Sequence, residues 1–149
     1  YRILNDSTKL INSIKEKFGK NENFIFEESV IPSESFHNSK CLISDWSGIS
    51  FEYAFVFEKP IIFIDVPKKI LNPEFDRISS EPIEITIREK IGKIVSPDNL
   101  DEIVDLIKKI DMDSNLMSDE IREIRSKTVF NINKSAGVGA EYIKKILDN

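Results

Sequence analysis

The fold is decided by residues 41–65, which read CLISDWSGISFEYAFVFEKPIIFID. Short apolar runs lie at both ends of this stretch, at residues 41–43 and 60–65, and such runs are typical of strands buried in a parallel sheet. Between them, residues 47–57 are apolar on most sides and carry one charge, Glu52, which predicts a helix covered by other parts of the protein. The stretch therefore predicts a strand, a helix and a second strand of a parallel sheet.

Further helices and strands are predicted on both sides of this unit. Apolar residues at helical spacing predict helices at residues 8–18, 97–110, 116–126 and 140–147. Short apolar runs predict strands at residues 23–26 and 93–95. Residues 32–38 fit a loop or one helical turn, and residues 83–89 fit an alternating strand or a short helix. Strands that alternate with helices in a chain of 149 residues predict a single α/β domain over residues 1–149.

The composition argues against several classes of protein. A net charge of −5 and a pI near 5.0, with no long run of Lys and Arg, disfavour a sequence-independent nucleic-acid binder. No apolar run approaches the roughly 18 to 20 residues of a membrane span, so we expect a soluble domain. Cys41 is the only cysteine, which excludes a disulfide within the chain and fits the cytoplasm. Because the chain begins with Tyr1, we expect it to be a piece of a longer protein.

Residues 44–48 form the junction between the first predicted strand and the helix. Open α/β sheets bind ligands at the carboxyl ends of their strands, which is where this junction lies. Ser47 stands where an N-cap is expected, and Gly48 leaves room for a ligand to approach the backbone. The amides of Gly48, Ile49 and Ser50, together with the helix dipole, predict a phosphate cradle. The alternative is that Ser47 only caps its own helix and Gly48 only relieves crowding.

Three further side chains are candidates for the same rim of the sheet. Glu52 lies one helical turn after Gly48 and offers its carboxylate to the vicinal hydroxyls of a ribose; alternatively it is a solvent-facing charge. Asp65 ends the second strand and offers a carboxylate to a hydroxyl or to a magnesium ion that bridges phosphates; alternatively it caps a turn. Trp46 either shields or stacks on a base, or packs in the core.

Cations and imidazoles are scarce near this rim. A diphosphate would accept one or two of the neighbouring cations, but we expect each of them to be a solvated charge. These cations are Lys68, Lys69, Arg77 and Arg88. His37 is the only histidine, and no Ser, Cys or metal-ligand pattern accompanies it, so we expect neither a catalytic role for it nor a metal site.

The sequence around this rim resembles that of a known family of transferases. Residues 43–55, ISDWSGISFEYAF, and residues 58–67, EKPIIFIDVP, resemble the CDP-glycerol glycerophosphotransferase family of teichoic-acid-type polymerases. Residues 69–75 and 82–92 are similar to the continuation in a bacterial branch of that family. Family members have the GT-B architecture, in which two Rossmann-like domains enclose the active site. The resemblance implies that this chain is the C-terminal, donor-binding half, a Rossmann-like three-layer domain with a parallel sheet.

The resemblance also implies an activity and a set of site residues. It implies transfer of glycerol phosphate, or a related polyol phosphate, from a CDP-linked donor to a lipid-linked or glycan acceptor of the cell envelope. The full-length protein would be cytoplasmic and peripheral at the inner face of the membrane. No cofactor is implied, and magnesium is compatible with the site without being required. The implied donor-binding residues are Asp45, Ser47, Gly48, Ile49, Glu52, Asp65 and Lys68.

The chain departs from the family pattern in two places. The usual aspartate, aromatic, serine, serine motif reads Asp45-Trp46-Ser47-Gly48, so a backbone contact must replace one hydroxyl contact to the diphosphate. His37 matches neither of the family's key histidines, so we expect the catalytic base in the missing N-terminal part and no turnover by this piece alone. Two alternatives stay open: a GT-B glycosyltransferase or epimerase domain that uses a nucleotide sugar, and a non-catalytic interaction module of the same fold.

Overall fold

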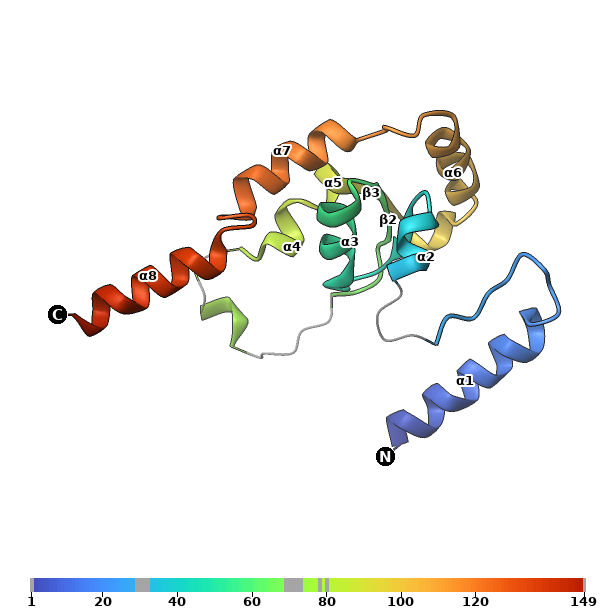
Figure 1. Ribbon diagram of the computed structural model, residues 1–149. Coiled ribbons are helices and arrows are strands. Elements are labelled where there is room, and N and C mark those ends of the chain that lie inside the picture. Colours follow the sequence, from blue (N-terminus) through green and yellow to red (C-terminus); the bar gives the residue numbers. More distant parts are fainter. Residues whose placement is uncertain (1, 29–32, 69–73, 78, 80, 149) are drawn as a thin grey trace. The chain divides into compact units, whose positions relative to one another are not determined.

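The computed structural model of the chain describes residues 2–28, 33–68, 74–77, 79 and 81–148 (Figure 1). These residues fall into two units, one within residues 1–37 and one within residues 38–149. The expectation of a single domain over the whole chain stays a prediction. In chain order the elements are α1 (Arg2–Phe18), α2 (Ser33–Asn38), β1 (Leu42–Ser44), α3 (Ile49–Phe57), β2 (Ile61–Ile64), η1 (Phe75–Arg77), α4 (Ile83–Thr86), α5 (Arg88–Ile91), β3 (Gly92–Val95), η2 (Pro97–Asn99), α6 (Glu102–Met112), α7 (Ser118–Thr128) and α8 (Ser135–Leu147).

Within residues 1–37, the chain turns back on α1 after the helix ends. The helix predicted at residues 8–18 is confirmed within α1. The rings of Phe18 and Phe24 lie 5.6 Å apart, and the Lys15 ammonium lies 4.3 Å from the centre of the Phe26 ring. The prediction of a strand at residues 23–26 is wrong, because these residues pack side chains on α1 and no strand pairs with them among the residues that the structure describes.

The strand–helix–strand unit predicted at residues 41–65 is confirmed. β1, β2 and β3 form a parallel sheet in that order, in which Ile43 and Lys93 lie on either side of Ile62. The last predicted strand is therefore β3, and α3 is the crossover that parallel neighbours require. The ambiguous segment at residues 83–89 is helical, in α4 and the start of α5.

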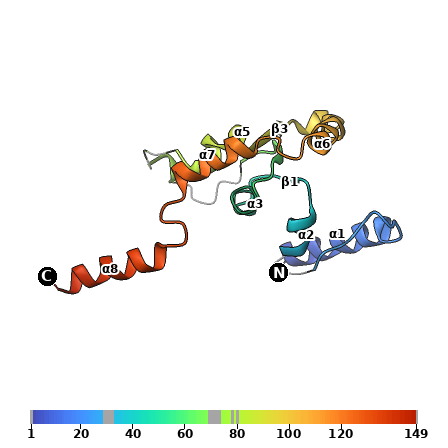
Figure 2. The ribbon, with the colours of Figure 1, turned by 45° about the horizontal axis from the view of Figure 1, so that its top comes forward.

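β2 is the buried centre of the described sheet. Residues 61–63 expose 1% or less of their surface. Successive strand residues face opposite sides, so Ile62 packs against Ile110 of α6 whereas the Phe63 ring lies 6.4 Å from the Phe51 ring of α3. Helices therefore cover both faces of β2. On the α3 side, α7 contacts both α3 and α5, as Figures 1 and 2 show.

β1 is less buried than its apolar sequence predicts. Ile43 lies opposite Ile62 in the register, so both side chains are on the same face of the sheet. Ile43 nevertheless exposes 47% of its surface, whereas Ile62 is fully buried. The prediction of a buried first strand is wrong for Ile43, because β1 is an edge of the described sheet and the apolar cluster around Ile62 is centred on β2, β3 and α6.

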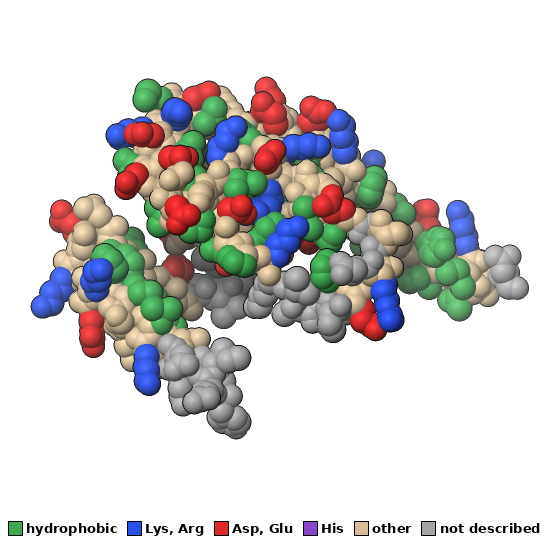
Figure 3. Space-filling model, turned by 180° about the vertical axis from the view of Figure 1, so that it is seen from behind, with side chains coloured by type: hydrophobic (Ala, Val, Ile, Leu, Met, Phe, Trp, Pro, Cys, Tyr) green, Lys and Arg blue, Asp and Glu red, His purple; other side chains and the backbone are tan. Residues whose placement is uncertain are grey.

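The remaining predicted helices are confirmed as α6, α7 and α8. α3 is covered along one side only, since Ser50, Tyr53 and Ala54 are buried while Val56 exposes 68% of its surface. Among the helices that the structure describes, none is both long enough and apolar enough to cross a bilayer. Acidic and basic side chains are interspersed over the face of the molecule seen in Figure 3.

The C-terminus of α3 is held by α7 through Glu58. Glu58 has the left-handed conformation, with φ 55°, and its N–H donates to Ala54 O at 2.9 Å. Its carboxylate accepts from Arg122 Nε at 2.6 Å and from Arg125 Nη2 at 2.7 Å, and Arg125 Nη1 also donates to Phe55 O at 2.7 Å. Cations are favourable at the carbonyl end of a helix. The hydrogen bond from Arg122, followed by that from Arg125, lowers the pKa of the Glu58 carboxyl.

Replacing Glu58 by Gln is expected to lower the free energy of unfolding by about 1 kcal/mol at pH 7, since partly exposed ion pairs contribute amounts of that order. A carboxylate with a lowered folded-state pKa stabilises the protein above its unfolded pKa, and this contribution is lost as the pH falls through the folded value. The difference between wild type and Glu58→Gln should therefore shrink towards about pH 3. Urea denaturation at both pH values measures it, with Glu120→Gln on the exposed side of α7 as the control. A difference that persists unchanged in acid would contradict the ion-pair explanation.

Candidate functional site

The turn between β1 and α3 is closed by its own backbone. Gly48 is the N-cap residue of α3, with φ −60° and ψ −28°, and no side chain caps the helix. Ser50 N–H donates to Ser47 O at 3.2 Å, and Phe51 N–H donates to Gly48 O at 3.1 Å. The prediction that Ser47 is the N-cap is wrong, because the helix begins one residue later than expected. The Ser47 hydroxyl is therefore not used to cap α3.

Two backbone amides remain available at this turn. The N–H groups of Gly48 and Ile49 have no acceptor among the residues that the structure describes. Gly48 is exposed, and Ile49 exposes 37% of its surface. The prediction of a third amide, that of Ser50, is wrong, because this N–H donates to Ser47 O and the residue is fully buried. The turn thus presents two adjacent donors at the positive end of the α3 dipole.

Gly48 is not required by the packing of the turn. A Cβ atom added there would meet nothing within 4 Å, and the residue has an ordinary right-handed conformation. The alternative in which Gly48 relieves crowding is therefore wrong. The space beside Gly48 is therefore open.

Carboxylates flank the turn on both sides. Asp45 precedes it and Glu52 follows it within the first turn of α3, and both are exposed. Glu52 N lies 3.5 Å from Gly48 O, so the residue that carries this carboxylate is one helical turn after the free amides. The predicted residues Asp45, Ser47, Gly48, Ile49 and Glu52 therefore gather at the start of α3.

A separate cavity of about 290 Å³ lies beyond the carboxyl end of β2. Asp65 extends the ladder past β2, since its N–H donates to Val95 O at 2.9 Å, and its side chain lines the cavity with Lys68. Trp46 forms another part of the wall, and its indole Nε1 donates to Val66 O at 2.7 Å. The predicted site residues thus divide into two groups, one at the α3 turn and one in this cavity.

Arg88 is the residue of the cavity that sequence reasoning placed wrongly. It was expected to be a solvated charge, yet it exposes only 4% of its surface. Its guanidinium carbon lies 3.8 Å from the centre of the Trp46 ring and 4.8 Å from that of Phe63, and Nη1 donates to Asp65 Oδ1 at 3.1 Å. Aromatic stacking and this ion pair explain how the charge is accommodated. No local pattern around residue 88 could have indicated its burial, because the rings and the carboxylate come from β2 and from the segments after β1 and β2.

Other polar groups of this unit have structural environments. The Tyr53 and Ser39 hydroxyls lie 2.9 Å apart, and burial raises the pKa of the tyrosine. Burial also raises the pKa of the Cys41 thiol, which makes a reactive thiolate unfavourable.

His37 lies in α2, within the other unit. Within the described part of the chain, no three His, Cys, Asp or Glu side chains gather as metal ligands, and Asp65 pairs with Arg88.

No family model, curated protein or solved structure matches this chain. The α3 turn offers hydrogen-bond donors to an anion and carboxylates to hydroxyls, and the cavity offers two cations beside an aromatic ring.

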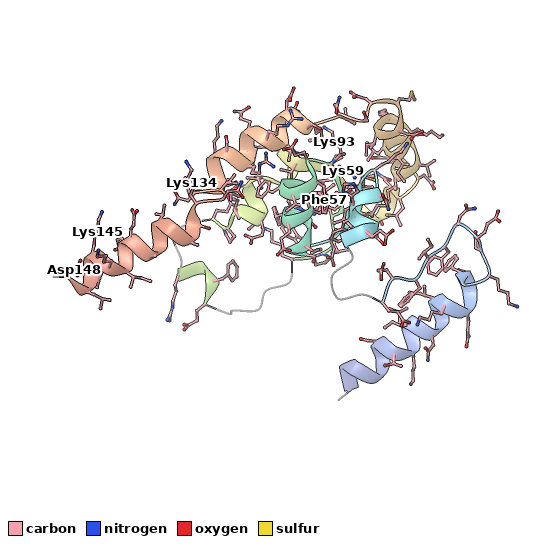
Figure 4. The ribbon with its side chains drawn as sticks, in the orientation of Figure 1. Phe57, Lys59, Lys93, Lys134, Lys145 and Asp148 are labelled. Atoms are coloured by element: carbon pink, nitrogen blue, oxygen red, sulfur yellow. The ribbon has the colours of Figure 1, made fainter. Side chains whose placement is uncertain are left out.

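A second cavity, of about 560 Å³, lies between α5, β3 and α7 and contains no predicted site residue. Its rim carries Lys93, which Figure 4 labels, together with acidic residues of α7 such as Glu120. Its floor includes apolar side chains, among them Leu116 and Ile124. Three lysines and three glutamates line it, which gives no net preference for an anion or a cation.

Proposed function

We propose that residues 38–149 form the donor-binding half of a glycerophosphotransferase that uses a CDP-linked polyol phosphate, with a Rossmann-like fold in a GT-B enzyme. The observation that carries this proposal is the α3 turn. The amides of Gly48 and Ile49 have no acceptor among the described residues, and packing does not require the exposed Gly48 to be a glycine. Both amides lie at the start of a nine-residue helix that follows a parallel strand. Helix N-termini with free amides bind phosphates, and the carboxyl edge of a parallel sheet is where such ligands lie.

Each residue of the turn has a distinct role in this proposal. The amides of Gly48 and Ile49 donate to the diphosphate. The hydroxyl of Ser47, which does not cap α3, adds a third donor. The Glu52 carboxylate accepts from the hydroxyls of the ribose, and Asp45 organises the turn. The resemblance of residues 43–67 to the family supports the same assignment, with the Gly48 amide in place of the missing serine hydroxyl.

The chain's own contribution to the reaction is to hold and orient the donor. Phosphoryl transfer depends on positioning and on stabilising charge on the transferred group, and both can be supplied by amides and cations. In this proposal the catalytic base and the lipid-linked or glycan acceptor belong with another domain of a longer enzyme at the inner face of the membrane. The described chain alone should bind the donor without turning it over.

The proposal is tested by adding CDP-glycerol, CDP and UDP to isotopically labelled chain and following the amide signals by NMR. CDP-glycerol should shift the Gly48 and Ile49 amides, and CDP should shift them more strongly than UDP. Ser47→Ala and Glu52→Gln should each weaken binding by about three- to tenfold, which corresponds to the loss of one hydrogen bond. Ser114→Ala and Glu141→Gln, both at exposed positions, are the matched controls. Unshifted amides at millimolar ligand would overturn the donor site.

Gly48→Ala separates binding from folding. The substitution should leave the free energy of unfolding unchanged or raise it by up to about 1 kcal/mol, because the conformation suits alanine and the added Cβ meets no atom. Affinity for CDP-glycerol should fall about tenfold, because the methyl group obstructs the amides. Equal affinity for wild type and variant would contradict close approach of the ligand to this backbone.

A further inference from the structure

The buried guanidinium of Arg88 is the least satisfied charged group among the described residues. Arg88 exposes 4% of its surface, and among the described residues its Nη1 donates one hydrogen bond, to Asp65 Oδ1. Nε and Nη2 are buried and have no hydrogen-bond partner in the described part of the chain. An arginine keeps its charge in proteins, so it cannot avoid the cost of burial by losing a proton.

Native proteins rarely leave buried donors unpaired, and a charged donor costs more than a neutral one. Stacking on Trp46 and Phe63 compensates part of this cost at the faces of the guanidinium, but it supplies no acceptor to the nitrogens. Asp65 balances the charge only partly, since its side chain remains 52% exposed and shares a single hydrogen bond. The arrangement is therefore incomplete without an acceptor that carries negative charge.

The cavity that Arg88 lines has the composition of an oxyanion site. Its charged side chains are three cations and two acids: Lys68, Arg88, Lys90, Asp65 and Glu89. The Lys68 ammonium lies 5.5 Å from the centre of the Trp46 ring, on which Arg88 also stacks, so two of the cations converge on one indole. Arginine forks match phosphate oxygens, and a volume near 290 Å³ approaches the lower limit of about 300 Å³ for small-molecule pockets.

We propose that the Trp46–Arg88 cavity binds a phosphate group, with Arg88 and Lys68 as the anion-holding side chains. Asp65 and Trp46 are positioning residues that fix the guanidinium by its ion pair and by stacking. The inference rests on the proposed function where it names the source of the phosphate: one phosphate of the donor's diphosphate lies in this cavity, and the other lies at the α3 turn. Free phosphate or pyrophosphate offers the same chemistry without the nucleotide.

Trp46 is the only tryptophan and lines the cavity, so its indole N–H, which donates to Val66 O, gives a single reporter beside the cavity. The full chain is titrated with pyrophosphate, inorganic phosphate, CDP, CDP-glycerol and cytidine while this signal is followed by NMR. Pyrophosphate and both CDP ligands should shift it saturably, and cytidine should not. Arg88→Lys keeps the charge but loses the fork, so affinity should fall at least tenfold, and Lys68→Ala should reduce it about threefold. Lys134→Ala, at the exposed position labelled in Figure 4, should change nothing.

The outcomes separate this proposal from the donor assignment. If CDP-glycerol shifts the Gly48 and Ile49 amides but no phosphate compound moves the Trp46 signal, the cavity proposal is wrong and the donor site stands. If pyrophosphate moves Trp46 while CDP-glycerol shifts neither group, the cavity binds phosphate and the donor assignment is wrong. Should Arg88→Lys fail to fold by far-ultraviolet circular dichroism, unchanged affinity in Lys68→Ala, which alters an exposed side chain, would overturn the proposal.

Discussion

Replacing Gly92 by Ala should destabilise the protein by about 3 kcal/mol, one of the largest effects expected of a single methyl group here. Gly92 is the first residue of β3 and lies opposite Ile61 of the buried central strand. Its backbone is extended, with φ −173°, so conformation alone would allow any residue. An added Cβ, however, would lie 2.1 Å from Ile61 O and 2.9 Å from its carbonyl carbon. Two backbones cannot yield as a flexible side chain does, so β2 and β3 would have to separate.

Gly48→Ala is the matched control, because the same methyl group meets nothing within 4 Å at that position. Urea denaturation of the full chain, followed by Trp46 fluorescence and circular dichroism, should show a large loss of stability for the substitution at residue 92 and none for the one at residue 48. Similar midpoints for the two variants would mean that β2 and β3 are not paired in the observed register.

Ile62→Ala should cost about 3 to 4 kcal/mol, the second large effect, because it leaves a cavity in the centre of the sheet. Ile62 is fully buried between its neighbouring strands and packs with Val95 and Ile110. Three elements meet at this side chain, so the surrounding structure has little freedom to collapse around the missing atoms. The same denaturation experiment measures the loss.

Ile43→Ala is the control for this core substitution. Ile43 lies opposite Ile62 and on the same face, but it exposes 47% of its surface, so the loss should stay below about 1 kcal/mol. Equal losses for the two variants would show that β1 is covered in solution, as its apolar sequence alone predicts.

The strand and helix pattern of residues 41–65 was predictable because it is local. Residues 61–64 are continuously apolar, and a run of that kind is favourable where both faces of a strand are covered. The prediction of a strand at residues 23–26 was wrong because strand pairing is not local. The aromatic residues of this segment have a strand-like composition, but pairing requires a neighbouring backbone, and in the structure those rings pack on α1.

The candidate site was predictable in part. The sequence indicated the turn and placed Asp45, Asp65 and Lys68 after predicted strands, at the carboxyl ends where the structure also has them. It misplaced the N-cap by one residue, since hydrogen bonding within the turn rather than the type of side chain selects Gly48. It also described Arg88 as solvated, although the rings of Trp46 and Phe63 bury it.

The sequence by itself determined the order of the central strands and helices and the junction at residues 44–48. The spacing of apolar residues and the residue types that favour turns depend only on a few neighbouring positions. Only the tertiary structure decided that Ile43 lies at an exposed edge, that two arginines of α7 hold Glu58, and that Arg88 lies against Trp46. Burial and ion pairing depend on which distant segments meet, and residues 46, 65 and 88 meet only once the parallel strands have assembled.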